Sequence, residues 1–185
     1  EDYAATRLSP DGRAVAGLTP EGEASLVDAE DGSLLASPVQ VFPEYGFDAP
    51  RFSPDGKRVL LLGEDGETGD YTYRGAQTED LALSSFGPGE RPDWQCAVAL
   101  FSPCGATIAS LWRSPDIVPT AGLRYVGFLR MERLSDGEVV EAPCPDDDLW
   151  TNMVPRAAIS PDGRLLAHNC ISDQLGLWDI ERRRT

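Results

Sequence analysis

The side chains in this sequence best suited to chemistry are carboxylates, and two short runs concentrate them. One run is Asp146-Asp147-Asp148 and the other is Glu64-Asp65-Gly66-Glu67. Clustered oxygens of this kind suit hard cations such as calcium. Neither run has the alternating ligand spacing of an EF-hand loop, so we interpret both as solvated acidic loops. We expect no metal site and no cofactor.

Groups for nucleophilic or acid–base catalysis are few. His168 is the only histidine, which excludes a histidine-cluster metal site, and it follows the apolar run Leu165-Leu166-Ala167, as a packed strand residue would. The sequence has no Gly-x-Ser-x-Gly nucleophile elbow. Acidic pairs are abundant, but in a chain of net charge −15 their abundance has no specificity. The sequence therefore predicts a protein that is not an enzyme.

The four cysteines are Cys96, Cys104, Cys144 and Cys170, at irregular spacing and without a Cys-x-x-Cys pair. This pattern favours buried free thiols, with a disulfide or incidental surface thiols as alternatives, and points to a reducing, cytoplasmic location. Cys104 replaces an aspartate in a repeated turn. We find no neighbour in the sequence that would lower its pKa and interpret it as an incidental substitution.

Composition excludes two classes of partner. With 31 acidic and 16 basic residues, the surface repels nucleic acid and anionic membranes, and Arg182-Arg183-Arg184 is the only basic run. No stretch approaches the roughly 20 apolar residues of a membrane span. The chain begins at Glu1 rather than methionine, which indicates that it was processed, trimmed or excised from a longer protein.

A turn sequence occurs four times and separates the predicted strands that position the residues above. It is Ser-Pro-Asp-Gly in three copies, and Cys104 replaces the aspartate in the third along the chain. Ser9 begins the first copy of Ser-Pro-Asp-Gly, and apolar stretches flank each copy. Proline presets φ at the second turn position and glycine tolerates a left-handed conformation, so each copy predicts a hairpin. The predicted turn residues are Pro10, Asp11, Gly12, Pro54, Asp55, Gly56, Pro103, Gly105, Pro161, Asp162 and Gly163.

The intervals between these turns are 44, 49 and 58 residues. A propeller blade takes about 40–45 residues, and we attribute the excess to two longer connections. We therefore predict an all-β fold, a β-propeller of about four blades, covering approximately residues 1–41, 42–88, 89–145 and 146–185 as one domain or partial propeller. The predicted strands are 3–8, 14–18, 24–28, 33–36, 47–52, 57–62, 95–101, 107–112, 123–134, 138–141, 154–159, 165–169 and 175–180. Residues 78–83 suggest a short helical turn. Residues 113–122 and 142–152 contain prolines, so we expect loops there.

The segment Ala157 to Ala167, followed by Leu175-Gly176-Leu177-Trp178-Asp179-Ile180, resembles a WD-repeat blade. Trp178 and Asp179 stand where that family has its naming dipeptide. The family's Gly-His dipeptide is absent before every first strand. Similar Ser-Pro-Asp-Gly hairpins occur in TolB-like propellers and in the propeller domains of prolyl-oligopeptidase-type peptidases. The resemblance implies a propeller that binds protein or peptide partners.

The fourth predicted blade lacks its outer strand. An open end exposes unpaired backbone and apolar blade faces. We therefore expect further blades in a parent chain, or an oligomeric partner that completes the last blade.

In an antiparallel meander, the loops between second and third strands share one end with the loops between blades. Fourteen acidic residues fall at that end, against only Arg91 and Arg113. Such a field attracts a basic partner. The alternative is that these loops are simply polar and that their tryptophans pack locally. The predicted interaction residues are Tyr45, Trp94, Arg113, Asp146, Asp147, Asp148 and Trp150.

The sequence thus predicts a non-catalytic scaffold that binds a protein or peptide, and the acidic loops favour a basic partner. The alternative function is an accessory propeller of a larger hydrolase.

Overall fold

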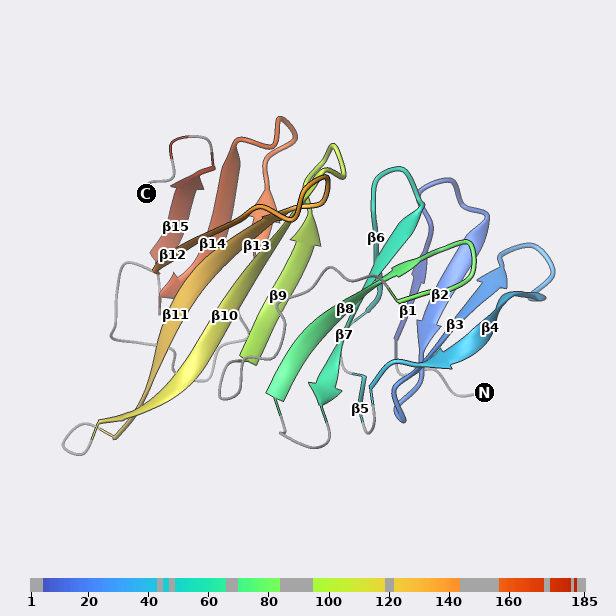
Figure 1. The fold of residues 1–185 in the computed structure, drawn as a ribbon, viewed down its shortest axis with the longest axis horizontal. Helices are drawn as coiled ribbons and strands as arrows, with labels where there is room; N and C mark the ends of the chain where they lie inside the picture. Colours follow the sequence, from blue (N-terminus) through green and yellow to red (C-terminus); the bar gives the residue numbers. More distant parts are fainter. Residues whose placement is uncertain are drawn as a thin grey trace. The chain divides into compact units, whose positions relative to one another are not determined.

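The structure is a computed structural model that describes residues 5–42, 45–46, 49–65, 70–83, 95–118, 122–143, 157–171, 174–180 and 182. Within its strands, the side chains of residues 45–46, 64–65, 70–71, 113–118, 122–126, 143, 169–171 and 174–175 are not described. The chain divides into two compact units, Glu1–Pro92 and Asp93–Thr185. Each unit contains two antiparallel sheets (Figure 1).

The first sheet is a four-stranded meander. Its strands are β1 (Ala5–Leu8), β2 (Ala14–Leu18), β3 (Glu23–Asp28) and β4 (Leu34–Gln40), in that spatial order. Alternation along β2 and β3 places Ala16 and Leu26 on the buried face. Strand β4 extends beyond the predicted residues 33–36 and contains register shifts opposite β3.

The second sheet has an interrupted first strand. Both β5 (Tyr45–Gly46) and β6 (Arg51–Phe52) pair with β7 (Arg58–Asp65), whose other edge is fully occupied by β8 (Asp70–Gln77). Since one edge of β7 is filled by β8, β5 and β6 share the opposite edge. Of the predicted single strand 47–52, residues 47–48 lie outside the described residues, 49–50 are not in a strand, and 51–52 form β6.

The predicted helical turn over 78–83 is also wrong. Residues 78–80 form a turn, and Leu83 then makes an isolated antiparallel bridge to Ala76. Gln77 donates its backbone N–H to the carbonyl of Ala82 at 3.0 Å, which closes a hairpin turn rather than a helical one.

The third sheet is the largest meander. Its strands are β9 (Gln95–Phe101), β10 (Thr107–Val118), β11 (Gly122–Arg133) and β12 (Val139–Pro143). The loop predicted over 113–122 is wrong, because β10 and β11 continue as a hairpin that pairs Pro115 with Tyr125. Leu134 N donates to Ala106 O, so by alternation the backbone nitrogen of Pro115 points away from β11. The described part of β9 begins at Gln95 opposite Arg113, so no described strand pairs with the Pro115 nitrogen.

The fourth sheet has three described strands, β13 (Ala157–Ile159), β14 (Leu165–Ile171) and β15 (Gln174–Asp179), in that order. Strand β13 contacts β9, so the first strands of the third and fourth sheets lie together.

Each unit has one core cluster. In the first unit, Ala16 and Leu26 of the first sheet share a cluster with Val59 and Leu61 of the second. In the second unit, Leu111, Leu129 and Met131 of the third sheet share a cluster with Leu166 and Trp178 of the fourth. The predicted all-β class is confirmed as four antiparallel sheets without a helix among the described residues. None of these sheets closes into a propeller.

Candidate functional site

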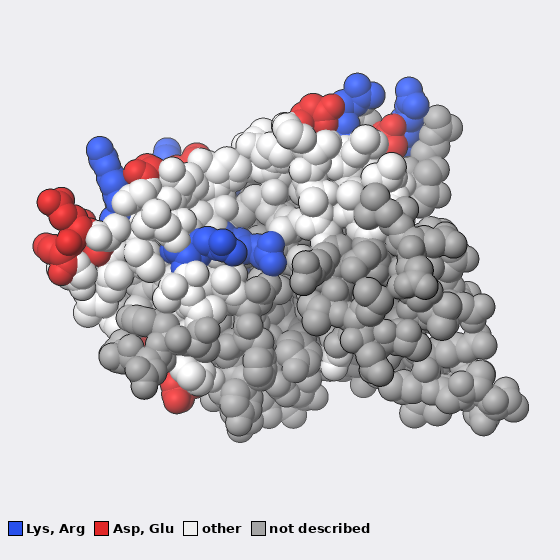
Figure 2. Space-filling view, turned by 180° about the vertical axis from the view of Figure 1, so that it is seen from behind, with Lys and Arg blue, Asp and Glu red and all other residues white. Residues whose placement is uncertain are grey.

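The predicted acidic loop face falls largely outside the described residues. Trp94, Asp146, Asp147, Asp148 and Trp150 all lie outside them. Tyr45 lies in β5 opposite Glu64, and Arg113 lies in β10 opposite Gly127, but neither side chain is described. The structure therefore does not bring these residues together or separate them. On the face that Figure 2 shows, described acidic and basic side chains lie together at the left and upper edges, and a group of basic side chains lies across the middle.

The Ser-Pro-Asp-Gly turns form one repeated hydrogen-bond unit. Each of three serine hydroxyls donates to the aspartate two residues later: Ser9 at 2.6 Å, Ser53 at 2.6 Å and Ser160 at 2.5 Å. Each serine oxygen also accepts the N–H five residues later, at 2.9 to 3.0 Å. The serine hydroxyl, and then a backbone N–H, hold the pKa of each turn aspartate below its usual value. The predicted turns are thus confirmed as structural elements.

Cys104 takes the aspartate position in the third turn. Its Sγ lies 3.4 Å from Ser102 Oγ, and this hydroxyl lowers the pKa of the thiol. The expectation that no neighbour lowers this pKa was wrong, because the turn itself directs Ser102 at position 104. The Cys104 side chain is exposed.

A cavity of about 120 Å³ opens between the third and fourth sheets of the second unit. This volume is several times what one water molecule needs. Met131, Val140 and Ile180 provide an aliphatic lining, and Thr107, Arg133, Glu138 and Trp178 complete it. Trp178, at the predicted naming dipeptide, is 4% exposed. Its indole Nε1 is buried and lacks a hydrogen-bond partner among the described residues.

The charged groups beside this cavity are one arginine and two carboxylates that pair with it. Arg133 forms ion pairs with Asp136 at 3.0 Å and with Glu138 at 2.5 Å. These groups are about half exposed, so the pairs are screened and stabilise the fold little. They place one cation and two carboxylates beside an apolar opening.

The outer edge of β15 lies beside the same cavity. Ile180 N donates to Arg164 O, so by alternation the N–H groups of Leu177 and Asp179 point away from β14. In the first and third sheets, the N–H groups equivalent to that of Asp179 belong to Asp28 and Arg133. Each donates at 2.8 Å to the carbonyl of the residue just before the fourth strand, Ser33 or Glu138. No described strand pairs with the outer edge of β15.

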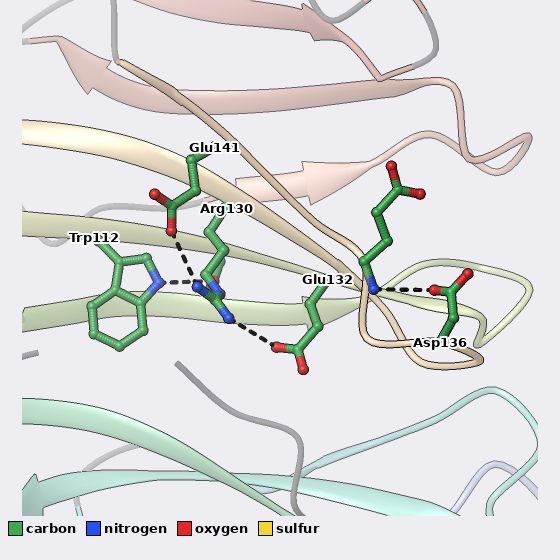
Figure 3. A network of polar contacts seen from close by, with 7 residues as sticks. Trp112, Arg130, Glu132, Asp136 and Glu141 are labelled. Atoms are coloured by element: carbon green, nitrogen blue, oxygen red, sulfur yellow. Dashed lines mark hydrogen bonds and ion pairs between the residues drawn. The ribbon is translucent and has the colours of Figure 1, made fainter. Parts of the chain in front are cut away.

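The third sheet also contains a buried ion network that the sequence prediction missed. Arg130 is 7% exposed, and its guanidinium lies 3.1 Å from Glu141 and 3.6 Å from Glu132 (Figure 3). Directly beside it, Trp112 Nε1 donates to Ser110 Oγ at 2.8 Å, and the indole stacks on Phe128. The sequence signal was the alternation in β11, where Phe128, Arg130 and Glu132 fall on one face.

His168 confirms the expectation of a packed strand histidine. It is 3% exposed and lies against Gly176, where a Cβ atom would overlap the imidazole ring. Burial lowers its pKa. Its Nδ1 is without a hydrogen-bond partner among the described residues.

Among the described residues, no group of three or more His, Cys, Asp or Glu side chains could hold a metal ion. No described helix is long and apolar enough to cross a membrane.

Comparison with protein-family models and with curated proteins found no match to this chain.

Proposed function

We propose that this chain is a run of four WD-type β-propeller blades and that it acts as a non-catalytic scaffold that binds an extended peptide segment of a protein partner. The four successive antiparallel sheets and their repeated Ser-Pro-Asp-Gly-type turns support the propeller part of this proposal.

The observation that carries the binding part is the outer edge of β15 beside the cavity, with which no described strand pairs. A peptide strand added antiparallel to β15 would accept from the N–H groups of Leu177 and Asp179. Strand β12 has no described counterpart in the fourth sheet, and an added strand would occupy that place. Its inward side chain would enter the aliphatic lining of Met131, Val140 and Ile180.

The chemistry of the cavity also favours a particular side chain. The buried Trp178 N–H gains a partner if the inward residue has an acceptor oxygen at the end of an aliphatic body. Threonine and glutamine meet this description. The acidic loops, with Tyr45, Trp94, Arg113, Asp146, Asp147, Asp148 and Trp150, would attract a basic peptide and speed its encounter.

The probe is a synthetic peptide with the sequence of residues 136–143, which include the outer strand β12. It is made in two forms, one with the native valine at position 140 and one with threonine there. We expect saturable binding that shifts the indole N–H resonance of Trp178, with the threonine form bound more tightly. In Trp178→Phe the preference for threonine should disappear. Binding without any Trp178 shift would contradict the site.

Leu177→Pro tests the strand edge, because it removes an outward N–H while sparing the ladder to β14. We expect it to abolish binding, whereas Leu177→Thr, at the same exposed position, should leave binding unchanged. Equal binding by both variants would place the peptide elsewhere.

Replacing both glutamates of the probe by lysine tests the acidic loops. The lysine form should bind more tightly at low salt, and this advantage should vanish in 0.5 M salt. Asp146→Asn with Asp148→Asn should remove the advantage. The matched control Glu30→Gln with Glu79→Gln removes two charges from exposed turns and should retain it.

A further inference from the structure

The first sheet presents an apolar row that crosses all its strands. Direct register pairs join Leu8 to Val15, Val15 to Val27 and Val27 to Leu34, so the four side chains share one face. We call them the front row. Leu8 is 54% and Leu34 58% exposed.

The same row is covered in other sheets. Its counterpart in the second sheet is Phe52–Val59–Ala76. Phe52 and Val59 have the same spacing from the turn at Ser53 as Leu8 and Val15 have from the turn at Ser9, and register adds Ala76. Val59 and Ala76 are buried in the cluster with the first sheet, and Phe52 packs against it. In the fourth sheet the counterpart is Ile159–Leu166–Trp178, which packs in the cluster with the third sheet.

The opposite faces carry a second equivalent pair, which we call the back row. It is Ala16–Leu26 in the first sheet and Ala109–Met131 in the third, and these residues are 1 to 8% exposed. The fourth sheet has Ala167–Leu177 at this position. Here Leu177 is 51% exposed, although its chemistry matches that of the buried pairs.

Within each unit, therefore, the back row of one sheet shares a core cluster with the front row of the next. In the front row of the first sheet Leu8 and Leu34 are exposed and the two valines between them are half-buried. In the back row of the fourth sheet Leu177 is exposed and Ala167 is half-buried. They are complementary in type, and neither contains a charged residue. Exposed apolar sheet faces of this kind mark interaction surfaces.

We propose that the back row of the fourth sheet binds the front row of the first sheet in a second copy of this chain. The second copy is chosen because it presents the complementary face that the internal packing specifies. The contact joins two different surfaces, so it is heterologous, and each copy offers one of each. It rests on the repeated sheet packing and not on the peptide site at β15.

The test is light scattering of the purified 185-residue chain over a concentration series. We expect the average mass to rise from 20.0 kDa to at least about twice that value. Leu177→Asp alone, and Leu8→Asp with Leu34→Asp, should each weaken association at least tenfold, since each places a charge in the contact. Val139→Asp, a 39% exposed residue outside both rows, should associate like the unchanged chain.

Mixing the two impaired variants tests the heterologous pairing. The Leu177→Asp copy retains its front row, and the Leu8→Asp/Leu34→Asp copy retains its back row, so an equimolar mixture should form a one-to-one complex. Circular dichroism of each variant confirms that it is folded. A monomer at all concentrations, or folded variants that fail to combine, would overturn the proposal. Either result would leave peptide binding at β15 unaffected.

Discussion

Leu81 in the turn after β8 occupies the position that Gly32 occupies in the turn after β3. Both residues have positive φ, 55° at Leu81 and 73° at Gly32. The same hydrogen bond closes both turns: the N–H of Gln77 donates to the carbonyl of Ala82, and the N–H of Asp28 donates to the carbonyl of Ser33. In each case the donor lies four residues before the positive-φ residue and the acceptor lies directly after it. Leu81 is 2% exposed in the core of the first unit. Burial of its side chain therefore outweighs an unfavourable backbone conformation.

This balance predicts an unusual order of stability at position 81. Leu81→Ala should lower the free energy of unfolding by about 2–5 kcal/mol, because it empties a core position. Leu81→Gly should be less destabilising than Leu81→Ala by about 1 kcal/mol, because glycine adopts positive φ without strain. Urea denaturation of both variants gives the difference. Ala109→Gly, in a regular strand, is the control and should be destabilising; a glycine at 81 less stable than alanine would contradict the argument.

The turn unit predicts reciprocal effects of exchanging cysteine and aspartate. Cys104→Asp should add a charge-assisted bond from Ser102, as at Asp11, Asp55 and Asp162, and raise stability by about 0.5 kcal/mol. Asp55→Cys should lower it by a similar amount. Thermal unfolding at pH 7 measures both.

The gain at position 104 should depend on pH. The aspartates of the equivalent turns have a pKa below the ordinary aspartate value of 3.8 because the serine hydroxyl stabilises their charged form. The stabilisation is present above the unfolded-state pKa and is lost as pH falls through the folded-state pKa. A gain in Cys104→Asp that persists after full protonation would show that it has another cause.

The buried ion network predicts different costs for two arginines of the same strand. Arg130→Met leaves the buried Glu132 without this cation, so we expect a loss of about 3–5 kcal/mol. Adding Glu132→Leu to this variant should recover part of the loss. Arg133→Met breaks exposed, solvent-screened pairs and should cost much less than Arg130→Met. Chemical denaturation distinguishes these cases, and equal costs for Arg130→Met and Arg133→Met would refute the argument.

His168 predicts how stability changes near neutral pH. Burial lowers its pKa below the ordinary value of 6.5, so the unfolded chain takes up a proton first as pH falls. The stabilisation is present above 6.5 and is lost as pH falls below that value toward the folded-state pKa. His168 is the only histidine, so His168→Asn should flatten the stability profile between pH 7 and 5. An unchanged slope in urea midpoints would exclude this role.

Several elements could be predicted because their cause is local. Ser53, Pro54, Asp55 and Gly56 carry their own turn chemistry. The continuous apolar run from Val59 to Leu62 indicates a strand that is buried on both faces, as the structure has it. Four strand–turn–strand units follow from such signals. The extension of β10 through Pro115 could not be predicted in this way, because proline argues against a strand unless its nitrogen points to an unpaired edge. That depends on where β9 stops pairing.

The candidate site shows the same division. Trp178 was identified from its place in the dipeptide, but the cavity beside it depends on β10, β11 and β12 facing β15. Arg130 was missed because a charged residue in a strand is usually exposed. Its burial depends on partners at Glu132 and Glu141, of which Glu141 lies in another strand.

The sequence by itself determined the all-β class, the four Ser-Pro-Asp-Gly-type hairpins and the acidic composition, because turn geometry, alternation and charge are properties of neighbouring residues. Only the tertiary structure decided which faces are covered and which edge is open. The pairs Ala16–Leu26 and Ala167–Leu177 hold equivalent register positions, yet Leu26 is 2% and Leu177 51% exposed. Leu26 also has Ala36 of β4 beside it, whereas no described strand pairs with the outer edge of β15. The physical reason is that burial is produced by a second surface, and a residue's own segment does not specify whether that surface is present.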